Sequence, residues 1–203
     1  MKRIRTGIVI FDAVEVLDFC GPFEVFSTTR LDEERRRDES SPFDVMLVAE
    51  GDQPVTTTGE MRVLPDATFE TCPALDILVV PGGWGTRTQM KNPAMLSFVK
   101  DHAAKADILA SVCTGALILG STGLLDGLRA TTHWRSLDLL RELFPNVMVD
   151  ATSHVVDQGR IITSAGISAG IDMALLVVKR YWGETVARNT AKHMEYPFTE
   201  SNA

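Results

Sequence analysis

The sequence predicts an α/β protein built on a doubly wound, mostly parallel β-sheet with helices on both faces. Short β-branched runs alternate with helix-like segments along most of the 203 residues, which is the pattern of repeated strand–helix–strand units. The strand-like runs are almost continuously apolar, as expected for strands that helices cover on both faces. Since no linker or internal repeat interrupts this pattern, we expect residues 1–203 to form one domain.

Four apolar runs in the first half are expected to form parallel strands joined by right-handed crossovers, namely TGIVIF, FDVMLVA, LDILVV and DILASVC. Pro favours the first helical turn, so one helix is expected to begin at Gly21-Pro22 and another after Asn92-Pro93. The run TGALILG, which follows DILASVC, predicts a third helix.

The second half predicts a strand end, a hairpin and three helices. RATTHW is interpreted as a strand end and SLDLLRELF as an amphipathic helix. SHVVDQGRIITSAG predicts a hairpin that turns at Gln158-Gly159. The apolar helix ISAGIDMALLVVKRYW is expected to end at Gly183, and ETVARNTAKHM predicts a final helix.

Charge and composition exclude several classes of protein. With 20 basic and 27 acidic residues the formal net charge is -7, so nucleic acid is not an expected partner. The N-terminal apolar run is too short for a secretion signal and no run is long enough to span a membrane. We therefore expect a cytoplasmic protein whose three cysteines are reduced thiols, with a spacing that fits no zinc site. The charged run 30–41 is interpreted as a solvated surface loop or helix end, with a lid or partner surface as the alternative.

Ligands of open α/β sheets bind beyond the carboxyl ends of the strands, where Cys113 is the main candidate. It lies between an apolar strand and a helix, with Gly115 two positions later, which predicts a sharp nucleophile elbow. A helix N-terminus favours thiolate over thiol, so we expect an activated nucleophile. The alternative is a cysteine that only fills space in the core.

Two further strand ends supply candidate binding groups. Gly82 and Gly83, in PGGWG with Trp84, allow close approach of the backbone to a ligand, and the Gly83 and Thr114 N–H groups are expected to form an anion hole. The alternative for this motif is an ordinary turn. His133, at the end of RATTHW, is expected to orient the thiolate or line the pocket, with a structural histidine as the alternative.

Asp18 follows the first strand among apolar neighbours. A carboxyl held among apolar groups has a raised pKa and can carry a proton to or from a reacting atom. The alternative is that Asp18 caps the helix that follows. Cys20 is interpreted as packing or as a resolving thiol, Cys72 as a loop or core residue, and the histidines other than His133 receive no role.

The stretches LDFCGPFEVF, LDILVVPGGWG, SVCTGALILGSTGLLDGLRATTHW and ITSAGISAGIDMAL together resemble the ThiJ/PfpI superfamily. The resemblance covers about residues 6–197 and implies a flavodoxin-like fold related to class I glutamine amidotransferases. The elbow SVCTG with LLDGLRATTHW is most similar to the branch that contains isonitrile hydratases and the N-terminal domains of AraC-type regulators.

This resemblance implies a nucleophile at Cys113, an acidic partner at Asp18, a flanking polar group at Thr114 and an anion-hole peptide at Gly83. The protease-like branch has His directly after the cysteine, where this chain has Thr114, and the deglycase-like branch has Glu where this chain has Asp18. Both differences favour the isonitrile hydratase pattern: a lyase that hydrates a small-molecule isonitrile to an N-substituted formamide through a thioimidate, without metal or cofactor. The resemblance also implies a homodimer.

Two alternatives come from other functional classes. One is a sensor of oxidants or small ligands without turnover, since a low-pKa thiol also serves redox sensing. Because the chain ends at EYPFTESNA without further basic helices, direct control of transcription is not expected. The other is hydrolysis of an amide or ester, or a deglycase-like activity.

Overall fold

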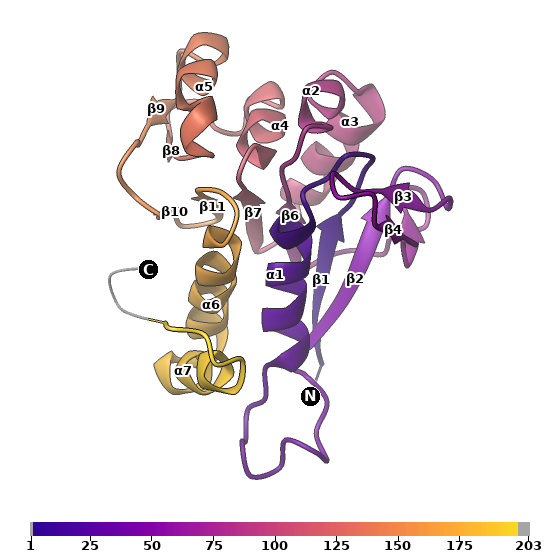
Figure 1. The fold of residues 1–203 in the computed structure, drawn as a ribbon, viewed down its shortest axis with the longest axis vertical. Helices are drawn as coiled ribbons and strands as arrows, with labels where there is room; N and C mark the ends of the chain where they lie inside the picture. The colour runs from indigo at the N-terminus through magenta and orange to yellow at the C-terminus, as the bar shows by residue number, and fades with distance from the viewer. Residues whose placement is uncertain (1, 199–203) are drawn as a thin grey trace.

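A seven-stranded sheet forms the centre of the computed structural model, which describes residues 2–198 (Figure 1). The strand order is β10-β11-β7-β6-β1-β2-β5, and every neighbouring pair is parallel except β10 and β11. The strands are β1 (Ile4–Val9), β2 (Phe43–Ala49), β5 (Ala67–Thr68), β6 (Ile77–Val80), β7 (Ile108–Val112), β10 (Val155–Gln158) and β11 (Ile161–Ser164). The predicted mostly parallel, doubly wound sheet is confirmed.

Helices cover both faces of this sheet because the chain winds outward from β1 in two directions. The step from β1 to β2 and the step from β6 to β7 run in opposite directions, so right-handed crossovers put their helices on opposite faces. These helices are α1 (Val16–Thr28) and α3 (Pro93–Ala103). On the α1 face lies α6 (Ala169–Trp182), and on the α3 face lies α4 (Gly115–Ser121).

Several predicted boundaries are confirmed. The Asn92 side chain accepts a hydrogen bond from the Ala94 N–H and so caps α3. Helix α6 ends at Gly183, whose φ of 85° suits glycine, and α7 (Glu184–His193) follows. The hairpin pairs Gln158 with Ile161, so its turn is Gly159-Arg160, one residue later than predicted.

The first helix begins earlier than the sequence predicted. It starts at Val16, so Pro22 lies inside it and not in its first turn. Proline has no N–H, so it leaves the Asp18 carbonyl without its usual helical donor. The helix tolerates this because Gly21 and Pro22 are buried against α6. Asp18 therefore lies in the first turn of α1, and no side chain caps this helix; the capping alternative for Asp18 is wrong.

The segment RATTHW was only partly predicted. Its strand, β8 (Arg129–Ala130), is short and pairs with β9 (Met148–Val149) outside the main sheet. The edge of β7 is already occupied by β11, so β8 cannot join there. The chain then turns through a short 3-10 helix, Trp134–Ser136, into α5 (Leu137–Leu143). A small hairpin, β3 (Val55–Thr56) with β4 (Arg62–Val63), was not predicted.

The charged run 30–41 lies at the end of the sheet opposite to the carboxyl ends of the parallel strands. It connects the C-terminus of α1 to the start of β2 and forms the loop at the foot of Figure 1. Arg36 pairs with Glu33 and donates to the Thr28 carbonyl. The surface-loop interpretation fits this position, and the lid interpretation is wrong because the loop is far from the strand ends that carry the candidate site. Among the described residues, no helix is long and apolar enough to cross a membrane.

A substitution at Gly115 tests how tightly the start of α4 packs on β6. A Cβ atom at this position would lie 2.1 Å from the Val80 carbonyl oxygen, a clash with rigid backbone. We expect Gly115→Ala to lower the free energy of unfolding by about 1–3 kcal/mol, as overpacking does, in denaturant titrations. Gly51→Ala is the control, because a Cβ there meets nothing within 4 Å and should change stability by less than about 0.5 kcal/mol. Equal stability of the two variants would contradict this packing.

Candidate active site

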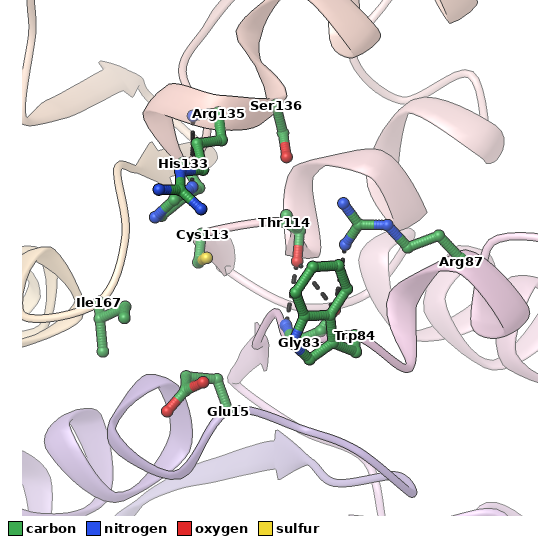
Figure 2. Close-up of a pocket in the computed structure, with 10 residues that line it drawn as sticks. All are labelled: Glu15, Gly83, Trp84, Arg87, Cys113, Thr114, His133, Arg135, Ser136 and Ile167. Carbon is green, nitrogen blue, oxygen red and sulfur yellow. Dashed lines mark hydrogen bonds between the residues drawn. The ribbon is translucent and has the colours of Figure 1, made fainter. Parts of the chain in front are cut away.

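The carboxyl ends of β1, β6, β7 and β11 meet around one small cavity of about 190 Å³. Figure 2 shows Cys113 between the segments that follow β6 and the 3-10 helix after β8. The cavity is lined by Glu15, Gly83, Trp84, Arg87, Cys113, Thr114, His133, Arg135, Ser136 and Ile167. It is smaller than the sites that hold drug-sized ligands, so it suits a small substrate.

Cys113 occupies the predicted strand-to-helix elbow. Its φ is 55°, a left-handed conformation that costs a non-glycine residue on the order of 1–3 kcal/mol. The surrounding backbone holds it there: its N–H donates to the Ser164 and Ala165 carbonyls, both at 3.2 Å, and its carbonyl accepts from the Thr132 hydroxyl at 2.7 Å. The side chain is 6% exposed and lies in the cavity lining.

Asp18 is not part of the cavity lining, but it lies next to the Cys113 thiol, which is. The residue is fully buried, and one carboxyl oxygen, Oδ2, accepts the Gly82 N–H at 3.0 Å. Burial raises the pKa of Asp18 to about 7, and the Gly82 N–H and the Cys113 thiol offset only part of this effect. The expectation of a raised pKa is met, and its physical cause is desolvation.

The expectation of a lowered Cys113 pKa is wrong. Burial raises the pKa of the Cys113 thiol above its ordinary value, and the nearby Asp18 carboxylate raises it further. The Thr114 N–H and hydroxyl act in the opposite direction but do not compensate. The helix N-terminus was correctly placed, yet the sequence alone did not show how little solvent reaches the sulfur.

Gly82, Gly83 and Thr114 form a connected group beside the sulfur. The Gly83 N–H donates to the Thr114 hydroxyl at 3.0 Å, and a Cβ on Gly82 would lie 2.5 Å from the Thr114 nitrogen. The close approach expected from PGGWG is therefore present. The anion hole stays a prediction, and a substrate would have to compete with the Thr114 hydroxyl for the Gly83 N–H. Trp84 lies at the rim and is 69% exposed.

His133 forms part of the cavity wall close to the sulfur. A Cβ on Gly166 would lie 2.4 Å from His133 Cδ2 and 3.0 Å from Cys113 Sγ, so both side chains converge on this glycine. Partial burial and the charges of Arg135 and Arg87 lower the pKa of His133. Its Nδ1 accepts the Arg135 N–H at 3.3 Å, so the neutral ring carries its proton on Nε2.

Sequence reasoning missed several residues of the cavity. Glu15, Arg87, Arg135, Ser136 and Ile167 were not assigned, nor was Gly166. The signal for Gly166 was available, because it lies two residues after β11, whose carboxyl end is at the same sheet edge as that of β7. The arginines could not be found in this way, since they lie beyond the strand ends.

The remaining cysteines and histidines are not part of this cavity. Cys20 and Cys72 are free thiols, partly buried, with pKa values raised by burial, that of Cys72 to about 11. Cys20 is two residues from Asp18 on α1, and positions i and i+2 of a helix do not face each other, which does not favour a resolving thiol. Within residues 2–198 there is no group of three His, Cys, Asp or Glu side chains arranged to hold a metal ion. The homodimer stays a prediction.

Comparisons with known proteins agree with this fold. The chain is 37% identical to an isonitrile hydratase of Pseudomonas putida over 193 residues, which is 95% of this chain and 78% of that protein. It is 32% identical over 127 residues, or 63% of this chain, to 34% of the HTH-type transcriptional regulator GbdR of Pseudomonas aeruginosa.

A crystal structure of a ThiJ/PfpI family protein from Pseudomonas syringae superposes with a TM-score of 0.86 and 31% identity, covering 98% of this chain and 77% of that one. The profile of the DJ-1/PfpI family matches residues 5–180, which include all four strand ends around the cavity. With its flavodoxin-like fold and its cysteine at the elbow, the chain belongs to the DJ-1/PfpI family.

Proposed function

We propose that this protein hydrates a small isonitrile to an N-substituted formamide, with Cys113 as nucleophile and Asp18 as acid and base. The observation that carries the proposal is a thiol paired with a buried carboxyl of near-neutral pKa below a small cavity. The similarity to the Pseudomonas putida isonitrile hydratase supports the choice of substrate.

In the first step the Cys113 sulfur adds to the terminal carbon of the isonitrile. The Asp18 carboxylate accepts the thiol proton as the sulfur–carbon bond forms and then donates it to the same carbon. The product is a thioimidate in which the former isonitrile carbon is bonded to sulfur, nitrogen and hydrogen. A carboxyl whose pKa is about 7 suits this step, because it can both accept and return a proton near neutral pH.

In the second step water adds to the thioimidate carbon. Asp18 accepts one proton from the water and passes it to the nitrogen. The carbon–sulfur bond then breaks, the hydroxyl becomes the formyl carbonyl, and the hydroxyl proton passes through Asp18 to the Cys113 sulfur. Isonitrile and water are consumed and one formamide is released, so atoms and protons balance without a redox step.

The sensor alternative is weaker on physical grounds. A thiol whose pKa is raised carries little thiolate near neutral pH and reacts slowly with peroxide. A ligand-binding role for the same cavity, the other form of the sensor alternative, would leave added isonitrile unchanged. Amide or ester hydrolysis would use the same two groups and would appear as turnover of carbonyl substrates alone.

The proposal is tested with a simple alkyl isonitrile, following formamide by NMR. We expect turnover by the unsubstituted protein, loss of turnover in Cys113→Ala, and a fall of about 10²–10⁴-fold in Asp18→Asn, the usual contribution of a general acid–base group. Cys20→Ala is the matched cysteine control and should retain activity. Full turnover by Cys113→Ala, or none by the unsubstituted protein, would refute the proposal.

The raised pKa of Asp18 predicts a pH-dependent stability. Between about pH 4 and pH 7 the unfolded chain has an ionised Asp18 while the folded protein keeps it protonated, so the folded state binds more protons and stability falls as pH rises. Asp18→Asn lacks this titration. We expect the unfolding free energy of the variant, relative to the unsubstituted protein, to increase from pH 4 to pH 8 by up to about 4 kcal/mol. A difference that stays constant across this range, in urea titrations, would show that Asp18 is ionised in the folded state.

A further inference from the structure

Two arginines stand at the mouth of the cavity, each stacked on a tryptophan. Arg87 belongs to α2 (Thr86–Gln89) and its guanidinium lies 5.2 Å from the centre of the Trp84 ring. Arg135 belongs to the 3-10 helix and lies 4.7 Å from the centre of the Trp134 ring. Figure 2 shows the two guanidinium groups on different sides of Cys113. Stacking on an aromatic face orients a guanidinium. Its N–H groups, which lie in the plane of the guanidinium, stay available to a ligand.

Neither guanidinium is neutralised by a carboxylate among the residues that the structure describes. The Arg87 guanidinium makes two long hydrogen bonds to described residues, both of 3.4 Å, to the Gly83 carbonyl and the Thr86 hydroxyl. The contact found for the Arg135 guanidinium is its stacking on Trp134. Most other arginines of the chain bond to carboxylates or backbone carbonyls, as Arg36 and Arg180 do.

The mouth of the cavity is therefore positively charged in a protein that is negatively charged as a whole. Two arginines and one acidic residue, Glu15, line the cavity, whereas the chain carries a formal net charge of -7. Both arginines lower the pKa of His133. Glu15 raises it, but its effect is smaller than that of either arginine. At His133 the charges of the two arginines therefore outweigh that of Glu15.

The size of the cavity limits the substituent that can lie between this mouth and the sulfur. About 190 Å³ admits a reacting group with a short chain, and a longer substituent must extend out of the cavity past rim residues such as Trp84, which is 69% exposed. The distal end of a short substrate would then lie beside the guanidinium groups. Planar guanidinium groups recognise carboxylates by paired hydrogen bonds.

We propose that Arg87 and Arg135 select a substrate whose substituent ends in a carboxylate, so that the isonitrile turned over at Cys113 is a short isocyano acid. The inference deepens the proposed function and rests on it for the identity of the reacting group. The recognition of a small carboxylate at the mouth is a separate property of the same cavity, and it is open to a separate test.

The first test compares two isonitriles that differ only in charge, a short isocyano carboxylate and its primary amide. We expect the unsubstituted protein to prefer the carboxylate in kcat/KM, and Arg87→Gln and Arg135→Gln each to lower this preference about tenfold, as expected for loss of one charge-assisted contact. Arg37→Gln is the matched control, because Arg37 is an exposed arginine of the loop 30–41 at the other end of the molecule. The preference should be unchanged in this control.

The second test does not need turnover. The rates at which iodoacetate and iodoacetamide alkylate Cys113 are measured by mass spectrometry of the Cys113 peptide. We expect the ratio of the iodoacetate rate to the iodoacetamide rate to fall in both cavity variants and with added salt, and to stay unchanged in Arg37→Gln.

The two measurements separate failure of the inference from failure of the proposed function. If no isonitrile is turned over but the alkylation ratio falls in the cavity variants, the carboxylate recognition stands and the hydratase reaction is refuted. If isonitriles are turned over and both ratios equal those of Arg37→Gln, the hydratase reaction stands and the carboxylate recognition is refuted.

Discussion

The burial of one carboxyl against one thiol is the constraint on which the rest of this site depends. Asp18 is fully buried and Cys113 nearly so. Ionising either group in such surroundings costs free energy. Asp18, in the first turn of α1, and Cys113, directly after β7, meet because the parallel sheet brings the carboxyl ends of β1 and β7 to one edge. The same burial makes the thiol a weak acid and the carboxyl a base of near-neutral pKa. In the proposed mechanism the proton therefore leaves the sulfur only as the sulfur–carbon bond forms.

The backbone around this pair is held by close packing. Cys113 keeps a strained φ because its N–H and carbonyl are tied to β11 and to Thr132. Glycines at 82, 115 and 166 lie where a side chain would collide with neighbouring atoms. These contacts hold the segments that follow β6, β7 and β11 close together. The site is therefore small, and its polar groups are fixed before a substrate binds.

Much of the fold could be predicted from the sequence because apolar β-branched runs alternate with helix signals. The runs that became β1, β2, β6 and β7 were identified as strands, and the site was placed beyond the carboxyl ends of β1, β6 and β7. The start of α1 was misplaced because a proline at 22 normally marks a first turn, whereas tertiary packing against α6 allowed it inside the helix. The direction of the Cys113 pKa was wrong because desolvation depends on atoms from several strands, which no local pattern contains. The arginines at the mouth were missed for the same reason.

The central claim is that the buried Asp18 carboxyl holds a proton until about neutral pH. Infrared difference spectra of the folded protein, recorded as a function of pH and compared with those of Asp18→Asn, report this proton through the stretching band of the protonated carboxyl. The account predicts a band that is absent from the variant and disappears with a midpoint near pH 7. Ionisation of Asp18 near pH 4, the ordinary range for an aspartate, would contradict it.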